Sequence, residues 1–136
     1  MLERHKVETE LRIDENLPFI SCSRNELLQC LINLLRNSIQ AVSGRTDLPP
    51  GSGKIIISAW LNESAVLEVN LIDNGEGIEP ERLPHLFQYG YTSKADGSGF
   101  GLSSVANFIR EQGGDISIYS DGINKGSSVK FTLPIA

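Results

Sequence analysis

The chain has 136 residues, which is enough for one domain with its own hydrophobic core. Its 12 Lys and Arg residues against 17 Asp and Glu residues give a net charge of −5, so the composition does not support a nucleic-acid-binding surface. No apolar stretch approaches the roughly 20 residues that span a bilayer, and no secretion signal opens the chain. We therefore expect a cytoplasmic globular domain.

Two cysteines, Cys22 and Cys30, are the only ones in the sequence, and they lie far from both histidines, His5 and His85. These separations do not match the ligand spacing of zinc sites. Cysteines beside or within a predicted helix are most simply reduced thiols of the core. No zinc site is expected.

The first two elements are predicted to be a strand and a long helix. Polar and apolar residues alternate over residues 6–13, which predicts a strand with one buried and one solvent-exposed side. One face of this strand carries Val7, Thr9, Leu11 and Ile13. Ser23 followed three residues later by Glu26 forms a capping box, so we expect a helix to begin there.

Two asparagines, Asn33 and Asn37, share one face of this predicted helix with Gln40, away from its leucine-rich face. Asparagine is a poor residue for a helix interior, and a solvated helix face normally carries Glu, Lys and Arg. Two interpretations stay open: a solvated face, or amide oxygens that ligate a hard cation or orient phosphate oxygens.

Residues 54–61 and 66–72 are predicted to form an antiparallel hairpin that leads directly into Asp-Asn-Gly-Glu-Gly-Ile at residues 73–78. A strand that ends in Asp-Asn-Gly usually enters a tight turn. However, the residues after Gly77 open a helix-like or lid-like segment instead of a returning strand. The carboxylate of Asp73 could then hydrogen-bond an amine-bearing base.

A short helix interrupted by a proline is expected over residues 80–88, followed by a polar loop that carries one cation, Lys94. Gly97, Gly99 and Gly101 then precede a helix expected at residues 101–112. Backbone N–H groups at such a helix start can wrap an anion, although a hinge would have the same pattern. The glycines match neither a Walker P-loop nor the dinucleotide fingerprint.

The last elements are predicted to be strands at residues 115–120 and 127–134, joined by a turn at residues 121–126. Together the predicted elements indicate one α/β (α+β) domain over residues 1–136. We expect a two-layer sandwich, with a mixed sheet of about five strands and helices on one face.

The ordered set of Asn-x3-Asn on a helix, Asp-x-Gly-x-Gly after a strand and Gly-x-Gly-x-Gly opening a helix resembles the catalytic, ATP-binding domain of sensor histidine kinases. That superfamily includes DNA gyrase, the heat-shock chaperone ATPase and mismatch-repair ATPases. Residues 33–41 are similar to its N box, 73–78 to its G1 box, 86–94 to its F box, 97–102 to its G2 box, and Gly126-Ser127 to its final box. The resemblance implies a Bergerat-type ATP-binding fold, in a fragment that lacks the phosphoacceptor domain.

The resemblance also implies ATP and Mg²⁺ as cofactors. Asp73 would accept a hydrogen bond from the adenine amine, Asn37 would ligate Mg²⁺, and Asn33 would hydrogen-bond nearby. Lys94 would carry phosphate charge in the lid, which covers residues 79–100, because Gln40 stands where many members have a basic residue. The expected catalytic residues are Asn33, Asn37 and Lys94; the other expected nucleotide contacts are Asp73, Gly75, Gly77, Ile78, Tyr91, Thr92, Ser93, Gly97, Gly99, Phe100, Gly101, Leu102 and Ser127.

In ATP-hydrolysing relatives, a glutamate four residues before the metal-binding asparagine activates water; here that position is Asn33, whose amide cannot take a proton. The resemblance therefore implies transfer of the γ-phosphoryl group to a histidine on a separate dimerisation domain of the same parent protein, with a response regulator downstream. The isolated domain is expected to be a monomer. The alternatives are an anti-sigma-type protein-serine kinase, an ATP-driven conformational module and a degenerate domain that only binds a partner.

Overall fold

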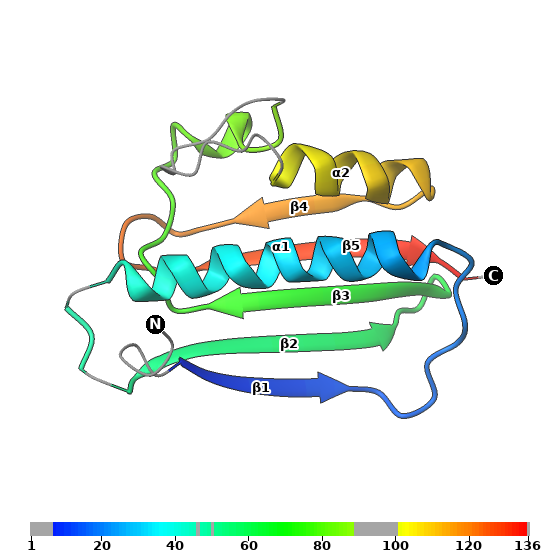
Figure 1. Cartoon of the computed structure of the whole chain (residues 1–136), viewed down its shortest axis with the longest axis horizontal. Helices are drawn as coiled ribbons and strands as arrows, with labels where there is room; N and C mark the ends of the chain where they lie inside the picture. The colour runs from blue at the N-terminus through cyan, green and yellow to red at the C-terminus, as the bar shows by residue number, and fades with distance from the viewer. Residues whose placement is uncertain (1–6, 46, 50, 89–100, 136) are drawn as a thin grey trace.

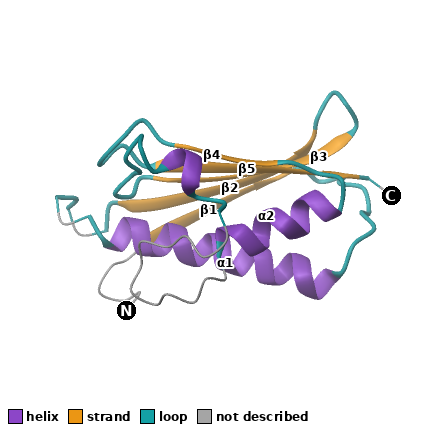
Figure 2. Cartoon of the chain, turned by 90° about the horizontal axis from the view of Figure 1, so that it is seen from above, coloured by secondary structure: helices purple, strands orange, loops and turns teal. Residues whose placement is uncertain are grey.

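Five strands form a single mixed sheet in the computed structural model, which describes residues 7–45, 47–49, 51–88 and 101–135 (Figure 1). The α-helices of this described part both lie on one face of the sheet, giving two layers (Figure 2). In chain order, the elements are β1 (Val7–Ile13), α1 (Arg24–Ser43), β2 (Gly53–Leu61), β3 (Val66–Asp73), the 3₁₀ helix η1 (Leu83–His85), α2 (Leu102–Glu111), β4 (Ile116–Tyr119) and β5 (Ser127–Pro134). The predicted two-layer α/β fold is confirmed.

The strand order along the sheet is β1-β2-β3-β5-β4. β1 runs parallel to β2, with α1 as the crossover between them, and the other neighbouring pairs are antiparallel. The two predicted hairpins, β2–β3 and β4–β5, are therefore confirmed. Because β3 lies beside β5, Asp73 at the end of β3 is opposite Ser127 at the start of β5.

Helix α1 begins where the capping box predicts. The Ser23 hydroxyl accepts a hydrogen bond from the Glu26 N–H group (3.3 Å), which satisfies one of the donors that every helix N-terminus leaves free. The residues that α1 buries recur every four positions: Cys30, Leu34, Ser38 and Val42. This stripe faces the sheet, so the neighbouring stripe of α1 that carries Asn33 and Asn37 is left for other contacts.

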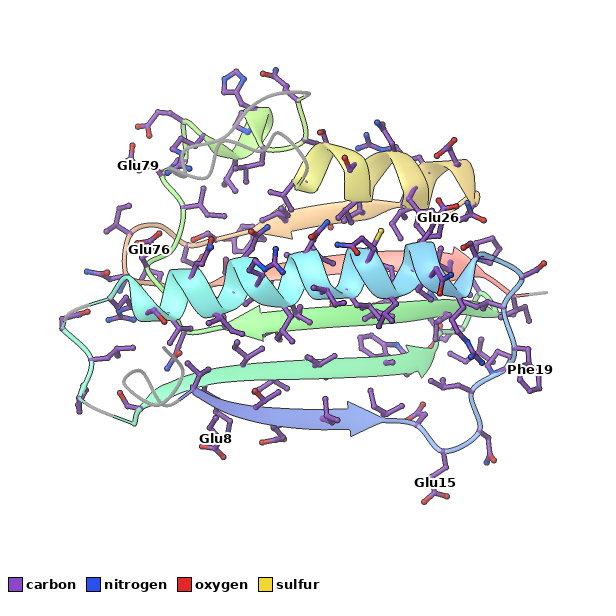
Figure 3. The ribbon with its side chains drawn as sticks, in the orientation of Figure 1. Glu8, Glu15, Phe19, Glu26, Glu76 and Glu79 are labelled. Atoms are coloured by element: carbon purple, nitrogen blue, oxygen red, sulfur yellow. The ribbon has the colours of Figure 1, made fainter. Side chains whose placement is uncertain are left out.

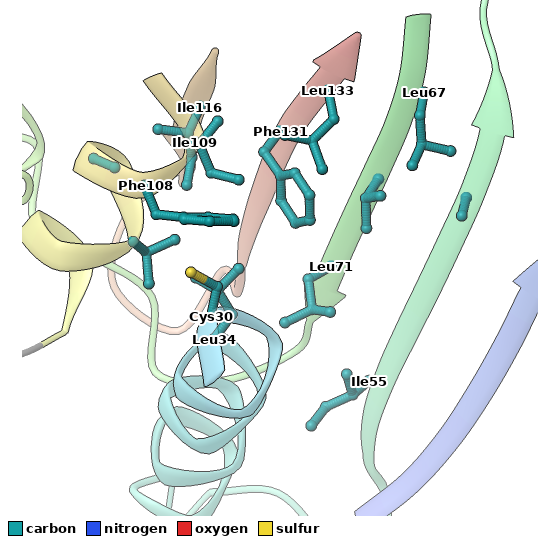
Figure 4. Packing of buried hydrophobic residues seen from close by; sticks show 14 of the residues in the cluster. Cys30, Leu34, Ile55, Leu67, Leu71, Phe108, Ile109, Ile116, Phe131 and Leu133 are labelled. Carbon is teal, nitrogen blue, oxygen red and sulfur yellow. The ribbon is translucent and has the colours of Figure 1, made fainter. Parts of the chain in front are cut away.

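The core lies between the sheet and the two helices (Figure 4). Its most completely buried large side chains come from both helices and from strands β2 and β5: Leu34, Ile55, Ile109, Leu133 and Val105. Helix α2 ends in a Schellman motif, in which Gly113 N–H donates to the Arg110 carbonyl oxygen and Gly114 N–H donates to the Ile109 carbonyl oxygen. In the described part of the chain, neither helix is both long enough and apolar enough to cross a bilayer.

The predicted buried side of the first strand is wrong for most of its length. Leu11 is 65% exposed and Ile13 is 47% exposed, although Val7 packs against the core. Helix α1 contacts β2 and β3, and α2 contacts β4 and β5, so neither helix lies over the edge strand β1 (Figure 1). The period of a strand indicates which residues share a face, but not whether another element covers that face.

The helix predicted at residues 80–88 is also shorter than expected. Only η1 is helical, in the 3₁₀ form, and turns flank it on both sides. Pro84 lies inside η1 and has no N–H group to donate, which limits the segment to short i→i+3 turns.

Replacing Leu34 by alanine should lower the free energy of unfolding by about 3 kcal/mol, because a fully buried side chain would leave a cavity between α1 and the sheet. Urea denaturation followed by circular dichroism measures this change. The control is Leu28→Ala on the same helix, where the side chain is 53% exposed and the loss should be only about 0.5 kcal/mol. Equal losses in the two variants would contradict the proposed core.

Candidate functional site

A buried carboxyl group, that of Asp73, lies at the end of β3 with 6% of the residue exposed. One oxygen accepts a hydrogen bond from the Gly75 N–H group (2.8 Å), and the other accepts from the Ser127 hydroxyl (3.0 Å). The Ser38 side chain and the Ser127 backbone donate further bonds. Burial raises the pKa of Asp73, and these hydrogen bonds oppose that rise by stabilising the charged form.

The last turns of α1 are held against the segment that follows Asp73. Glu76 N–H donates to the Ala41 carbonyl oxygen (2.9 Å), and Figure 3 shows Glu76 beside the C-terminal end of α1. A Cβ atom added at Gly75 would lie 2.7 Å from the Ala41 backbone carbon and from its Cβ. Only glycine therefore allows this close approach of the turn to the helix.

Helix α1 brings Asn33 and Asn37 toward the same place. Asn33, Asn37 and Ala41 follow one another at intervals of four residues, which is about 6 Å of helix axis per step, so they form one stripe. Both asparagines are half-buried, and the Asn33 amide oxygen accepts a hydrogen bond from the Gln29 side chain (3.4 Å). Asn37 consequently lies one helical turn from the contact between α1 and the Asp73–Glu76 turn.

The turn between β4 and β5 closes the other side of the same segment. Asn124 N–H donates to the Glu76 carbonyl oxygen (2.7 Å), and Gly126 N–H donates to that of Gly75 (3.2 Å). Gly77 has a φ of +75°, and a Cβ there would lie 2.0 Å from the Gly122 carbonyl oxygen. The glycines of this segment are thus required by contacts within the protein itself, whatever ligand is bound.

The side chain of Asn74 is turned toward β2 and has a structural role. Its oxygen accepts from the Lys54 N–H group (2.8 Å), and its amide nitrogen donates to the Ser52 carbonyl oxygen (2.9 Å). Arg45, which follows α1, donates to the Asn74 carbonyl oxygen (3.1 Å). These bonds fix the backbone next to Asp73 to the start of the neighbouring strand.

The start of α2 offers backbone N–H groups to an anion. Among the described residues, no side chain caps this helix, its first turn contains no acidic residue, and a Cβ added at Gly101 would meet nothing within 4 Å. Uncapped N–H groups and the helix dipole both favour negative charge at such a position. Nearby, Leu86 is buried and the Arg110 guanidinium lies 5.6 Å from the centre of the Phe87 ring, so residues 86–87 are anchored to α2.

The sequence matches the family described as "Histidine kinase-, DNA gyrase B-, and HSP90-like ATPase" over residues 22–136. The chain belongs to this family. The resemblance to the histidine kinase catalytic domain is therefore confirmed.

Similar proteins support this family assignment. The chain is 33% identical to Sporulation kinase D of Bacillus subtilis (strain 168) and 34% identical to Sensor histidine kinase ZraS of Escherichia coli (strain K12). These matches cover 97% and 94% of this chain but only 24% and 26% of those proteins, so the chain spans about a quarter of their length. A solved structure of the catalytic domain of histidine kinase ThkA is 26% identical, covers 98% of this chain and 84% of that one, and superposes with a TM-score of 0.80.

The structure brings Asp73 into contact with Gly75 and with Ser127 on β5, and Gly77 and Ile78 follow in the same segment. Asn33 and Asn37 lie on the stripe of α1 that reaches this segment at Ala41. Gly101 and Leu102 start α2. The remaining expected contacts lie outside the described residues: Tyr91, Thr92, Ser93, Lys94, Gly97, Gly99 and Phe100.

Two serines of the site escaped sequence analysis. Ser38 is 4% exposed and bonds Asp73, and Ser120 is 7% exposed and bonds the N–H group of Ile78 (3.0 Å). Ser38 could have been noticed as a polar residue in the stripe that α1 buries. Ser120 gives no such signal, because its bond to Ile78 joins residues that are distant in sequence.

Replacing Ser127 by alanine should raise the pKa of Asp73 further, because it removes a hydrogen bond that favours the carboxylate. A raised pKa means that the folded state retains a proton which the unfolded chain loses near pH 3.8, the ordinary value for aspartic acid. Stability from this group is therefore present at low pH and falls as the pH rises from that value to the raised pKa, and the variant should extend this fall to higher pH.

A ¹³C NMR titration of the carboxyl carbon of Asp73 measures the shift. The matched control is Ser128→Ala, because the next residue of β5 points to the other face of the sheet. An unchanged titration midpoint in Ser127→Ala would show that the hydroxyl does not stabilise the carboxylate.

Proposed function

We propose that this ATPase-family domain binds Mg·ATP and transfers the γ-phosphoryl group to a histidine on a separate dimerisation and phosphoacceptor domain of the same parent protein. The observation that carries the proposal is Asn33. It stands on α1 at the position where the family resemblance places a water-activating glutamate in the hydrolysing members, and an amide cannot act as that base.

The adenine end of the nucleotide would be recognised by Asp73. A carboxylate has about four acceptor positions, and Asp73 already accepts from Gly75, from Ser38 and from the hydroxyl and backbone of Ser127. The adenine amine would therefore share an oxygen with one of these donors or replace it. In a buried setting, a purine with a carbonyl oxygen in place of the amine would put two acceptors against each other, at a high cost. The site should therefore prefer ATP.

The phosphate end would lie between Asn37 and the start of α2. The donor chemistry fits magnesium, because this ion prefers oxygen ligands and usually takes few from the protein and the rest from phosphates and water. Consistent with such a site, the described residues contain no cluster of three or more His, Cys, Asp or Glu side chains that would hold a metal ion by themselves. A bound Mg²⁺ would neutralise phosphate charge with Asn37 as its protein ligand, and the N–H groups at the start of α2 would donate to phosphate oxygens.

In the proposed transfer, the bond from the γ-phosphorus to the β–γ bridging oxygen breaks, and a bond to an imidazole nitrogen forms while ADP leaves. A neutral imidazole has a free lone pair, so it needs no proton acceptor in this domain before it attacks. Water and a serine hydroxyl do need one. Asn33 therefore disfavours both the conformational ATPase and the protein-serine kinase.

As in two-component signalling, a response regulator would receive the phosphoryl group, and the isolated domain would be a monomer. Cys22 and Cys30 are free thiols, as expected for a protein in the reducing cytoplasm.

Incubation with γ-labelled Mg·ATP tests the function. The isolated domain should bind ATP and release little free phosphate, and the parent protein should acquire label in an acid-labile bond to nitrogen. Asp73→Asn is the control, because it should weaken ATP binding while the domain stays folded. Steady phosphate release by the isolated domain would instead indicate a hydrolase. Absence of ATP binding would favour the degenerate domain that only binds a partner.

Asn37→Ala should reduce the enhancement of ATP affinity by magnesium about tenfold, because the proposed protein ligand of the ion is removed. Titration of a fluorescent ATP analogue with and without Mg²⁺ gives this ratio. Gln40→Ala is the matched control, since it removes an exposed amide from the same helix. An unaltered magnesium response in Asn37→Ala would place the metal ligand elsewhere.

A further inference from the structure

The hydroxyl group of Ser120 uses all of its hydrogen-bonding capacity at one junction. It donates to the Gly126 carbonyl oxygen (2.7 Å) and accepts from the N–H groups of Gly122 (3.2 Å) and Ile78 (3.0 Å). The first two bonds close the turn between β4 and β5, and the third joins that turn to the segment after Asp73. Ser120 itself is 7% exposed, so water cannot easily replace these bonds.

Two partners of Ser120, Gly126 and Ile78, connect it to the candidate adenine site. Gly126 also donates its N–H to the Gly75 carbonyl oxygen, and the next residue, Ser127, bonds the Asp73 carboxylate. Gly126 has a φ of +72°, and a Cβ there would lie 2.2 Å from the Asp73 carbonyl oxygen, so the turn is packed directly on this strand end. A displacement of the turn would therefore move Gly75 and Ser127, which both donate hydrogen bonds to the Asp73 carboxylate.

The third partner, Ile78, lies at the point where the chain leaves the sheet. Residue 79 begins the segment that the family resemblance assigns to the lid, and Figure 3 shows Glu79 above Glu76, further from the end of α1. The Ile78 N–H bond fixes the direction in which this segment leaves. One hydroxyl thus connects the turn that supports Asp73 with the root of the lid segment.

We infer that Ser120 is a positioning residue for nucleotide binding: its hydroxyl holds the β4–β5 turn and the Asp73–Ile78 segment in the arrangement that accepts an adenine base. The inference rests on the proposed function, since it presumes that ATP occupies this site. Ser120 acts through the backbone of Gly126 and Ile78 and would not touch the nucleotide.

The test compares the affinities for ATP and for ITP, a purine nucleotide without the 6-amine, in the wild type, Ser120→Ala and Ser120→Thr. Ser117→Ala is the matched control, because Ser117 is an exposed residue of β4, the strand that leads into Ser120. Binding is measured at a temperature where circular dichroism shows every variant to be fully folded. This condition separates positioning from stability.

Ser120→Ala should weaken ATP binding about tenfold, the effect of losing one hydrogen bond to a buried partner, and should bring the ratio of ATP to ITP affinity closer to one. Ser120→Thr keeps the hydroxyl and should stay near the wild-type values, as should Ser117→Ala. A lower melting temperature with unchanged affinity and unchanged ATP preference in folded Ser120→Ala would overturn the inference, because Ser120 would then only stabilise the fold.

Should Ser120→Ala not fold, Ser120→Cys takes its place, because a thiol has similar size but is a weak donor and acceptor. Reduced ATP affinity and reduced ATP preference in that variant support the inference, and wild-type values overturn it. Failure of the wild type to bind ATP is a different result, since it rejects the proposed function itself and the inference with it.

Discussion

The carboxyl group of Asp73 is buried at the end of a central strand, and a buried charge is costly unless hydrogen bonds stabilise it. No single segment provides enough donors. The turn after β3 contributes Gly75, helix α1 contributes Ser38, and strand β5 contributes Ser127. The fold must therefore hold three separate parts of the chain at one point, and the order of the strands, with β5 beside β3, is what makes this possible.

The crossover helix has two roles in this arrangement. Its buried stripe, which includes Leu34 and Ser38, fixes the helix on the sheet, while the neighbouring stripe carries Asn33 and Asn37 toward the candidate phosphate region. Because the two stripes belong to one rigid helix, packing in the core sets the position of the polar groups. The contact of Ala41 with the turn at Gly75 defines how far along the sheet the helix lies.

Much of this could be predicted from local sequence patterns. The capping pair Ser23 and Glu26 gave the start of α1, alternation gave the two hairpins, and the spacing of polar residues indicated the candidate site. What escaped prediction depends on contacts distant in sequence. The exposure of Leu11 follows from where a helix lies relative to the sheet edge, and the role of Ser120 follows from its bond to Ile78 in the distant segment after β3. Neither leaves a periodic signal.

The tight fit around the glycines has a consequence for how distant relatives are compared. Gly75, Gly77 and Gly126 each face backbone atoms of the protein itself, so a relative that had lost nucleotide binding would still need glycine there in order to fold. Selection on folding alone would preserve the glycine pattern. Under the proposed function, inactive members of the family should therefore be identified by replacement of polar residues such as Asp73 and Asn37, while their glycines stay unchanged.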